Sequence, residues 1–157
     1  MKKLWGFMVF ALFLAGCASQ DTMETVADEV MTAMAAVRSI RLELPEETVM
    51  PVMETDTGEI YICRDFEVSL QTLPGGDLER TVETLTGFEL EDVTVMQAGD
   101  RYDLVWSCAG ELGAEVGRAR ILSDGAYHYC LTAQSSEANA EDCREMLSGM
   151  FESFELE

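Results

Sequence analysis

The chain has 157 residues, of which 30 are Asp or Glu and 10 are Lys or Arg, so its formal net charge at pH 7 is −20. A surface this acidic repels nucleic-acid phosphates and anionic lipid headgroups, which excludes nucleic-acid binding and attachment to a membrane through a basic patch. The length suffices for one domain with a hydrophobic core and is too short for two ordinary domains.

The first seventeen residues have the parts of an export signal in the usual order. Lys2 and Lys3 form a basic start, residues 4–14 form an apolar run, and residues 14–17 read Leu-Ala-Gly-Cys. The apolar run is too short to span a bilayer comfortably, and small residues before Cys17 suit the cleft of a signal peptidase. This segment resembles the lipobox of bacterial lipoproteins.

The resemblance implies that residues 1–16 are removed and that Cys17, the new N-terminus, carries a diacylglyceryl thioether. Two acyl chains anchor a protein stably, whereas one does so only marginally. We therefore expect an extracytoplasmic protein that is lipid-anchored to the cell membrane, or to the outer membrane in a Gram-negative organism. An ordinary secretory signal remains the alternative.

Beyond Cys17 the apolar pattern predicts a tether followed by one folded domain. Residues 17–37 are expected to form a lipid-anchored tether with a short amphipathic helix, because apolar side chains recur at helical spacing from Met23 to Val37. Residues 38–157 are expected to form a single domain.

The first half of this domain is predicted to contain short strands and one helix. Alternating apolar residues predict strands over residues 38–44, 49–53, 59–63 and 66–72. A Pro-Gly-Gly break follows, and Asp77 stands where it can cap a short helix over residues 78–85 that ends at Gly87.

The second half is predicted to contain strands in quick succession and one long helix. The strands are expected over residues 93–97, 102–109, 115–122 and 126–133. The apolar stripe of the last helix runs from Ala140 to Phe154. Strands joined by tight turns, with helices at either end of the run, indicate an α+β fold in which helices pack on a twisted antiparallel sheet.

The end of the chain resembles a known family. Residues 124–133 read Asp-Gly-Ala-Tyr-His-Tyr-Cys-Leu-Thr-Ala, and the last helix closes in Met-Phe-Glu-Ser-Phe-Glu-Leu at residues 150–156. A last strand rich in Tyr, Leu and Thr before a helix ending in a Ser-Phe pair is similar to PsbP-like bacterial lipoproteins of unknown function. The likeness covers about residues 90–157, and residues 38–89 only in element order. It implies a PsbP-like sandwich and no particular activity.

Four cysteines follow Cys17 and are candidates for disulfides: Cys63, Cys108, Cys130 and Cys143. They contain no Cys-x-x-Cys pair, and their spacing matches no compact zinc site. An even number in an exported domain favours two structural disulfides, with buried thiols as the alternative. If Cys108 points inward, it meets Cys143 from the last helix, which leaves Cys63 with Cys130.

No residue pattern points to catalysis or to a cofactor. His128 is the only histidine, and its place in a predicted strand is more typical of a structural residue than of a catalytic base. The chain has no Gly-x-Ser-x-Gly elbow, no glycine-rich phosphate loop and no His-Glu-x-x-His helix. We therefore expect a protein that is not an enzyme, with no cofactor and no assigned metal.

The remaining hypothesis is an envelope-tethered binding or interaction module, whose protein or small-molecule partner the sequence does not name. Aromatic side chains suit both cores and recognition surfaces, and the candidates for binding are Tyr61, Tyr102, Trp106, Tyr127 and Tyr129. The alternative is binding of a divalent cation by acidic loops, either around Gly58 or before residue 93. The carboxylates of these loops are Glu54, Asp56, Glu59, Glu89, Glu91 and Asp92.

Overall fold

The computed structural model describes residues 36–46, 51–63, 65–110 and 113–157. The chain divides into residues Met1–Ala36 and Val37–Glu157, and the account below concerns the second part. The expected leader, the lipidation site Cys17 and the amphipathic helix that starts at Met23 lie outside the described residues, so these three remain predictions.

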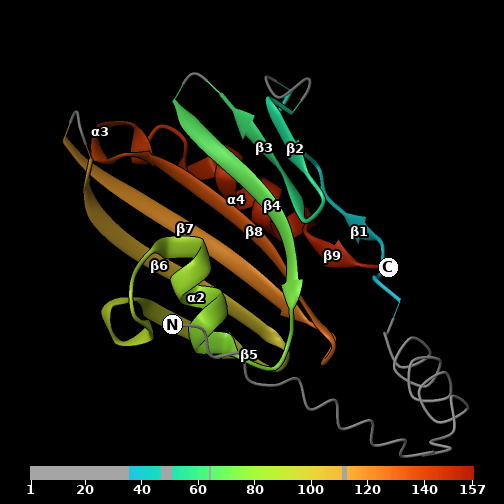
Figure 1. Ribbon diagram of the computed structural model, residues 1–157. Helices are drawn as coiled ribbons and strands as arrows, with labels where there is room; N and C mark the ends of the chain where they lie inside the picture. The colour runs from blue at the N-terminus through green and yellow to red at the C-terminus, as the bar shows by residue number, and fades with distance from the viewer. Residues whose placement is uncertain (1–35, 47–50, 64, 111–112) are drawn as a thin grey trace, which may run out of the picture. The chain divides into compact units, whose positions relative to one another are not determined.

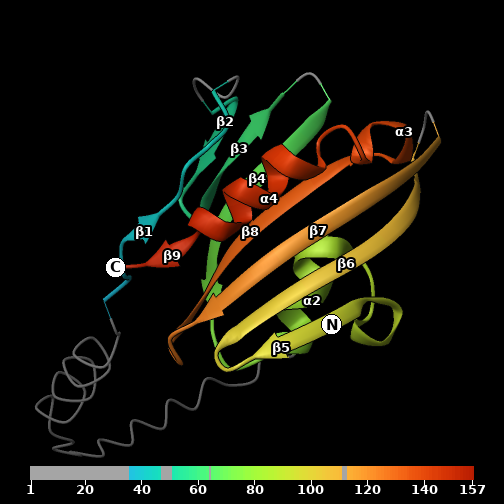
Figure 2. The same cartoon turned by 180° about the vertical axis from the view of Figure 1, so that it is seen from behind.

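Antiparallel strands build most of the domain. Seven strands within the described ranges form one sheet in the order β2-β3-β4-β8-β7-β6-β5, and every neighbouring pair is antiparallel. In chain order they are β2 (Met53–Thr55), β3 (Gly58–Ile62), β4 (Phe66–Pro74), β5 (Thr94–Ala98), β6 (Arg101–Gly110), β7 (Gly113–Ser123) and β8 (Tyr127–Ser136). Figures 1 and 2 show the sheet from its two sides.

Two short strands join the beginning and the end of the domain. Strand β1 (Ile40–Arg41) pairs antiparallel with β9 (Glu155–Leu156), and Arg41 forms an exposed ion pair of 2.5 Å with Glu155. The sequence predicts a longer first strand, over residues 38–44, and no strand at the C-terminus. Only Ile40 and Arg41 pair with β9, and Glu157 N continues the contact with a hydrogen bond of 2.9 Å to the backbone oxygen of Ser39.

Helices pack on both faces of the sheet. Helix α4 (Arg144–Ser153) covers one face, and helix α2 (Leu78–Thr86) lies on the other (Figures 1 and 2). The α2 boundaries agree with the sequence: Asp77 caps the helix by accepting a hydrogen bond of 3.0 Å from Arg80 N, and Gly87 ends it with φ 73°. The predicted α+β fold, an antiparallel sheet with helices packed on it, is confirmed.

The expected C-terminal helix is divided. A short helix α3 (Glu137–Ala140) precedes α4, and Cys143 stands at the N-cap of α4. A short 3-10 helix, η1 (Leu90–Asp92), also precedes β5. The prediction of a buried apolar face is therefore confirmed, whereas that of one continuous helix is wrong, because residues 141–143 form a turn.

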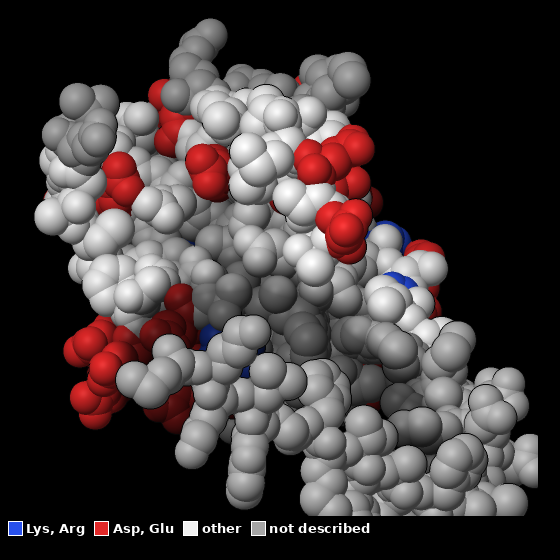
Figure 3. Space-filling model, viewed as in Figure 1, with Lys and Arg blue, Asp and Glu red and all other residues white. Residues whose placement is uncertain are grey.

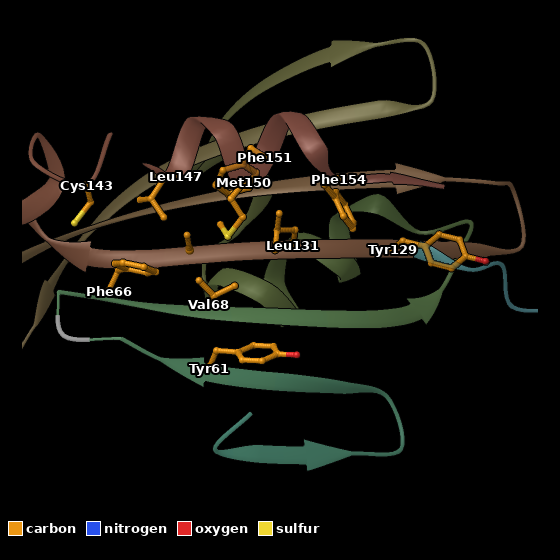
Figure 4. Close-up of a cluster of buried hydrophobic side chains, with 11 residues drawn as sticks. Tyr61, Phe66, Val68, Tyr129, Leu131, Cys143, Leu147, Met150, Phe151 and Phe154 are labelled. Carbon is orange, nitrogen blue, oxygen red and sulfur yellow. The ribbon is translucent and has the colours of Figure 1, made fainter. Parts of the chain in front are cut away.

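Because side chains alternate along each strand, the sheet separates two buried clusters. The α4-side core, drawn in Figure 4, consists of Tyr61, Phe66, Val68, Tyr129, Leu131, Ala133, Cys143, Leu147, Met150, Phe151 and Phe154. The α2-side core consists of Val82, Val93, Leu104, Trp106, Ala119, Ile121 and Cys130.

A half-buried arginine connects α4 to the sheet. Arg120 of β7 forms an ion pair of 2.6 Å with Asp103 of β6 and donates a hydrogen bond to the backbone oxygen of Phe151 in α4. The guanidinium carbons of Arg118 and Arg120 lie 5.1 and 6.0 Å from the centroid of the Phe151 ring, within range of a cation–π interaction. The helix is thus fixed by directional contacts in addition to apolar burial.

We predict that Arg120→Met lowers the free energy of unfolding by about 2 kcal/mol, because Asp103 Oδ1 and the Phe151 carbonyl oxygen both lose their donor. The matched control is Arg101→Met, since Arg101 also pairs with Asp103 (3.1 Å) but its side chain is 46 % exposed. An exposed pair contributes about 0–1 kcal/mol. Urea denaturation measures both variants, and equal losses would contradict this role.

His128 is a buried structural residue. It is 4 % exposed, and its Nδ1 lies 2.8 Å from the hydroxyl oxygen of Thr81 in α2. The Thr81 hydroxyl donates its one proton to the backbone oxygen of Asp77 at 2.9 Å, so Nδ1 is the donor to Thr81. Burial lowers the pKa of His128, because it disfavours the charged imidazolium more than nearby Asp124 and Asp77 favour it.

The lowered pKa of His128 predicts acid sensitivity. Above pH of about 6.5 the imidazole is neutral in the folded and the unfolded chain, so it contributes no pH dependence. Below that pH the unfolded chain takes up the proton first, and the free energy of unfolding therefore falls. Wild type and His128→Gln should show a stability difference that changes between pH 7.5 and pH 5. A constant difference in urea titrations over this range would contradict the assignment.

Candidate functional site

A groove of about 490 Å³ lies where the β2–β3 hairpin meets β4, β1 and the start of β8. We call it the Tyr127 groove. Its lining residues are Val37, Ile40, Thr55, Asp56, Thr57, Gly58, Glu59, Leu70, Thr72, Pro74 and Tyr127. The volume falls in the range of ordinary ligand sites.

The groove combines an apolar part with an acidic edge. Ile40, Leu70 and Tyr127 all pack against the α4-side core and supply apolar surface. Asp56 at the tip of the hairpin is exposed, and Glu59 is half-buried. The arrangement suits a segment that carries both apolar and positively charged side chains.

The hairpin is held against β4 at a distance that only glycine allows. Gly58 stands opposite Gln71 of β4, and a Cβ atom at Gly58 would lie 2.1 Å from the backbone oxygen of Leu70. Thr72 N donates a hydrogen bond of 2.7 Å to the backbone oxygen of Thr57, which ties the turn to the same strand. This close approach closes one side of the groove.

We predict that Gly58→Ala lowers the free energy of unfolding by about 1–3 kcal/mol, because the hairpin must move away from β4. Gly149→Ala is the matched control. Gly149 lies in α4, and a Cβ atom there would meet nothing within 4 Å. Alanine should stabilise the helix by about 0.5–1 kcal/mol. Thermal and urea unfolding compare the two variants, and a Gly58→Ala protein as stable as wild type would contradict the close packing.

Hydrogen bonds fix the wall that Tyr127 forms. Asp124 Oδ1 accepts hydrogen bonds from Tyr127 N at 2.7 Å and Ala126 N at 2.9 Å. The Tyr129 hydroxyl donates to Asp124 Oδ2 at 2.9 Å and accepts from Arg38 N at 2.8 Å. These hydrogen bonds hold the pKa of Asp124 below its usual value, and the bond from Tyr127 N has the largest effect. The two tyrosine rings meet edge to face with centroids 6.3 Å apart. The wall is therefore organised before any partner arrives.

All five aromatic binding candidates belong to one of the two cores or pack against it. Tyr129 and Trp106 are buried, and Tyr102 packs against the α2-side core. Tyr61 is buried as well, and its hydroxyl donates to Glu59 Oε2 at 2.6 Å. Burial is the main reason that the pKa of Tyr61 is raised to about 12, and the hydrogen bond to Glu59 raises it further. Tyr127 is the one candidate of the five that lines the groove.

The structure does not bring together the cysteines that the sequence paired. Cys130 belongs to the α2-side core, whereas Cys143 belongs to the α4-side core and Cys63 packs against the latter. Cys108 lies two residues after Trp106 on β6. Alternate residues of a strand point to the same face, so Cys108 also faces the α2 side. Each expected pair, Cys108 with Cys143 and Cys63 with Cys130, is therefore separated by the sheet, and this pairing is wrong.

Acidic side chains greatly outnumber basic ones on the face shown in Figure 3. Within the described ranges, however, no three His, Cys, Asp or Glu side chains gather in a group that could hold a metal ion. The carboxylates of the β2–β3 hairpin and of η1 thus form no such group, and the cation hypothesis has no geometric support there. No helix in the described part of the chain is long and apolar enough to cross a membrane.

Comparison with known proteins identifies the fold. No protein-family model matches the chain, and no curated protein matches its sequence. The Ran-binding protein Mog1p of Saccharomyces cerevisiae has a similar structure, with a TM-score of 0.53, 16 % identity, and coverage of 74 % of this chain and 89 % of Mog1p.

Two further solved structures are similar. LpqN, which is involved in cell envelope biogenesis of Mycobacterium tuberculosis, has a TM-score of 0.50 and 14 % identity, with 76 % of this chain and 84 % of LpqN covered. The cyanobacterial PsbP of Synechocystis sp. PCC 6803 has a TM-score of 0.47 and 10 % identity, over 78 % of this chain and 95 % of that one. At these identities the likeness to Mog1p and LpqN shows the fold and nothing more.

Proposed function

We propose that this protein is a lipid-anchored, non-enzymatic binding module of the bacterial cell envelope. We further propose that the Tyr127 groove receives an exposed protein segment with basic and apolar side chains. The observation that carries the proposal is the groove itself, whose apolar surface and acidic edge lie on a preorganised wall.

Charge and shape both support this kind of partner. The chain has three times as many acidic as basic residues, so its field attracts cationic segments and repels anionic ones. Apolar side chains of the partner would cover Leu70 and Tyr127, while a Lys or Arg would lie beside Asp56. Rim charges of this kind mainly increase the association rate and the salt dependence of binding.

The lipoprotein-like leader supports the envelope location. A diacylglyceryl group on Cys17 would leave the domain in water at the membrane surface. Two proteins of similar fold each agree with one part of the proposal: Mog1p is a Ran-binding protein, and LpqN is involved in cell envelope biogenesis. They support the class of function and name no partner for this chain.

The test uses the full chain, with its own leader, in cells of the organism that makes it. A photo-crosslinking amino acid replaces Thr57 at the groove or, as the control, Met96 on edge strand β5, which is 59 % exposed. We expect a discrete crosslinked product from position 57 and none from position 96. Equal products from both positions, or none from position 57, would contradict the proposal.

Two charge reversals test the chemistry of the partner. Asp56→Lys should reduce the crosslink from position 57 several-fold, because it repels a basic segment. Glu79→Lys, on the exposed side of α2, changes the net charge equally and should have little effect.

The lipid anchor is tested separately. Cys17→Ser should prevent lipid attachment, measured by incorporation of labelled fatty acid, and unchanged incorporation would contradict the proposed anchor.

A further inference from the structure

We propose that Cys63 and Cys143 form a disulfide that ties the β3–β4 turn to the start of α4. The alternation along β3 gives the first reason. Tyr61 points into the α4-side core, so Cys63, two residues further, faces the same side of the sheet. Cys63 N donates a hydrogen bond of 2.9 Å to the backbone oxygen of Phe66, so the pairing of the hairpin continues through Cys63.

Cys143 reaches the same place from the helical layer. It stands at the N-cap of α4, is 3 % exposed, and belongs to the cluster against which Cys63 packs. In Figure 4 its sulfur lies at the end of the cluster where Phe66 lies. Both cysteines are thus on one face of the sheet and at one end of it.

A hydrogen bond already joins the two segments. Asn139 Nδ2 donates to Asp65 Oδ1 at 3.2 Å. Asp65 is two residues from Cys63, and Cys143 N donates to the backbone oxygen of Asn139 at 3.0 Å, one helical turn away. The turn and the helix start are therefore held together beside the two thiols.

The register of the sheet excludes a disulfide between the other two cysteines, Cys108 and Cys130. Cys130 stands opposite Ile121, which in turn stands opposite Tyr102 of β6. Cys108 lies six residues further along β6, about 20 Å from that level, and a disulfide needs Cα atoms within about 7 Å. Burial also raises the pKa of the Cys130 thiol to about 12, which suppresses its reactive thiolate.

The bond would form by thiol–disulfide exchange with an oxidised protein dithiol or a small-molecule disulfide. Cys63 lines a cavity of about 480 Å³ with Asp65 and Asn139, so its half-buried thiol is the accessible one. Its thiolate attacks a sulfur of the oxidant and releases one thiol. The Cys143 thiolate then attacks the sulfur of Cys63 in the mixed disulfide and releases the second thiol. Two protons leave the cysteines and two electrons pass to the oxidant.

The crosslink would close a loop of about eighty residues, which contains most of the sheet, and would stabilise the domain by restricting the unfolded chain. An oxidising compartment outside the cytosol would supply the oxidant. The inference does not depend on the Tyr127 groove, because its test needs no partner.

The test equilibrates the reduced, purified full chain with oxidised glutathione, alkylates the remaining thiols under denaturing conditions, and maps the peptides by mass spectrometry. Trypsin cuts the chain after Cys17 only at arginines, and it leaves Cys130 and Cys143 together in residues 121–144. A second digestion at glutamates separates them, because Glu137 and Glu141 lie between. We expect residues 60–64 linked to residues 142–144, with Cys108 and Cys130 alkylated.

Thermal unfolding with and without reductant provides the second readout. Reduction should lower the Tm of the wild type by roughly 5–15 °C. Cys108→Ser should show the same drop, whereas Cys63→Ser, at a half-buried position, should show none. Cys143→Ser is a second variant without the bond. A link that involves Cys108 or Cys130, an alkylated Cys63, or a wild-type Tm that reductant does not change would overturn the proposal.

Discussion

Strand β8 lies between β4 and β7, and its side chains are buried on both faces of the sheet. Tyr129 and Leu131 point into the α4-side core, and the alternate residues His128 and Cys130 point toward α2. A shift of one residue in its register would exchange these two sets. The two cores, the buried histidine and the place of Cys130 therefore depend on this one alignment.

The same strand connects the core to the groove. Tyr127 begins β8 and forms the groove wall. Two residues further along the strand, the hydroxyl of Tyr129 is hydrogen-bonded to both Asp124 and Arg38. Because the wall is an extension of a strand buried on both faces, hydrogen bonds and packing hold it in place without a ligand. Preorganisation of this kind lowers the entropy cost of association.

Several of the few arginines in this acidic protein make contacts that join its secondary-structure elements. Arg120 and Arg118 lie against the Phe151 ring of α4, and Arg41 pairs with Glu155 between the two terminal strands. Thirty acidic residues share only ten basic ones, so most carboxylates cannot have a basic partner of their own. The negative surface field follows from the net charge of −20.

Local signals in the sequence determined the α+β class, the capped helix after Asp77 and the alternation of buried residues, because caps, turns and periodicity depend on near neighbours in the chain. The tertiary structure alone decided that Phe66 aligns with Ser135, which places β4 beside β8 across nearly seventy residues. Such pairings have no local signature. The groove and the two separate cores depend on them, so the sequence could name these residues but not their neighbours.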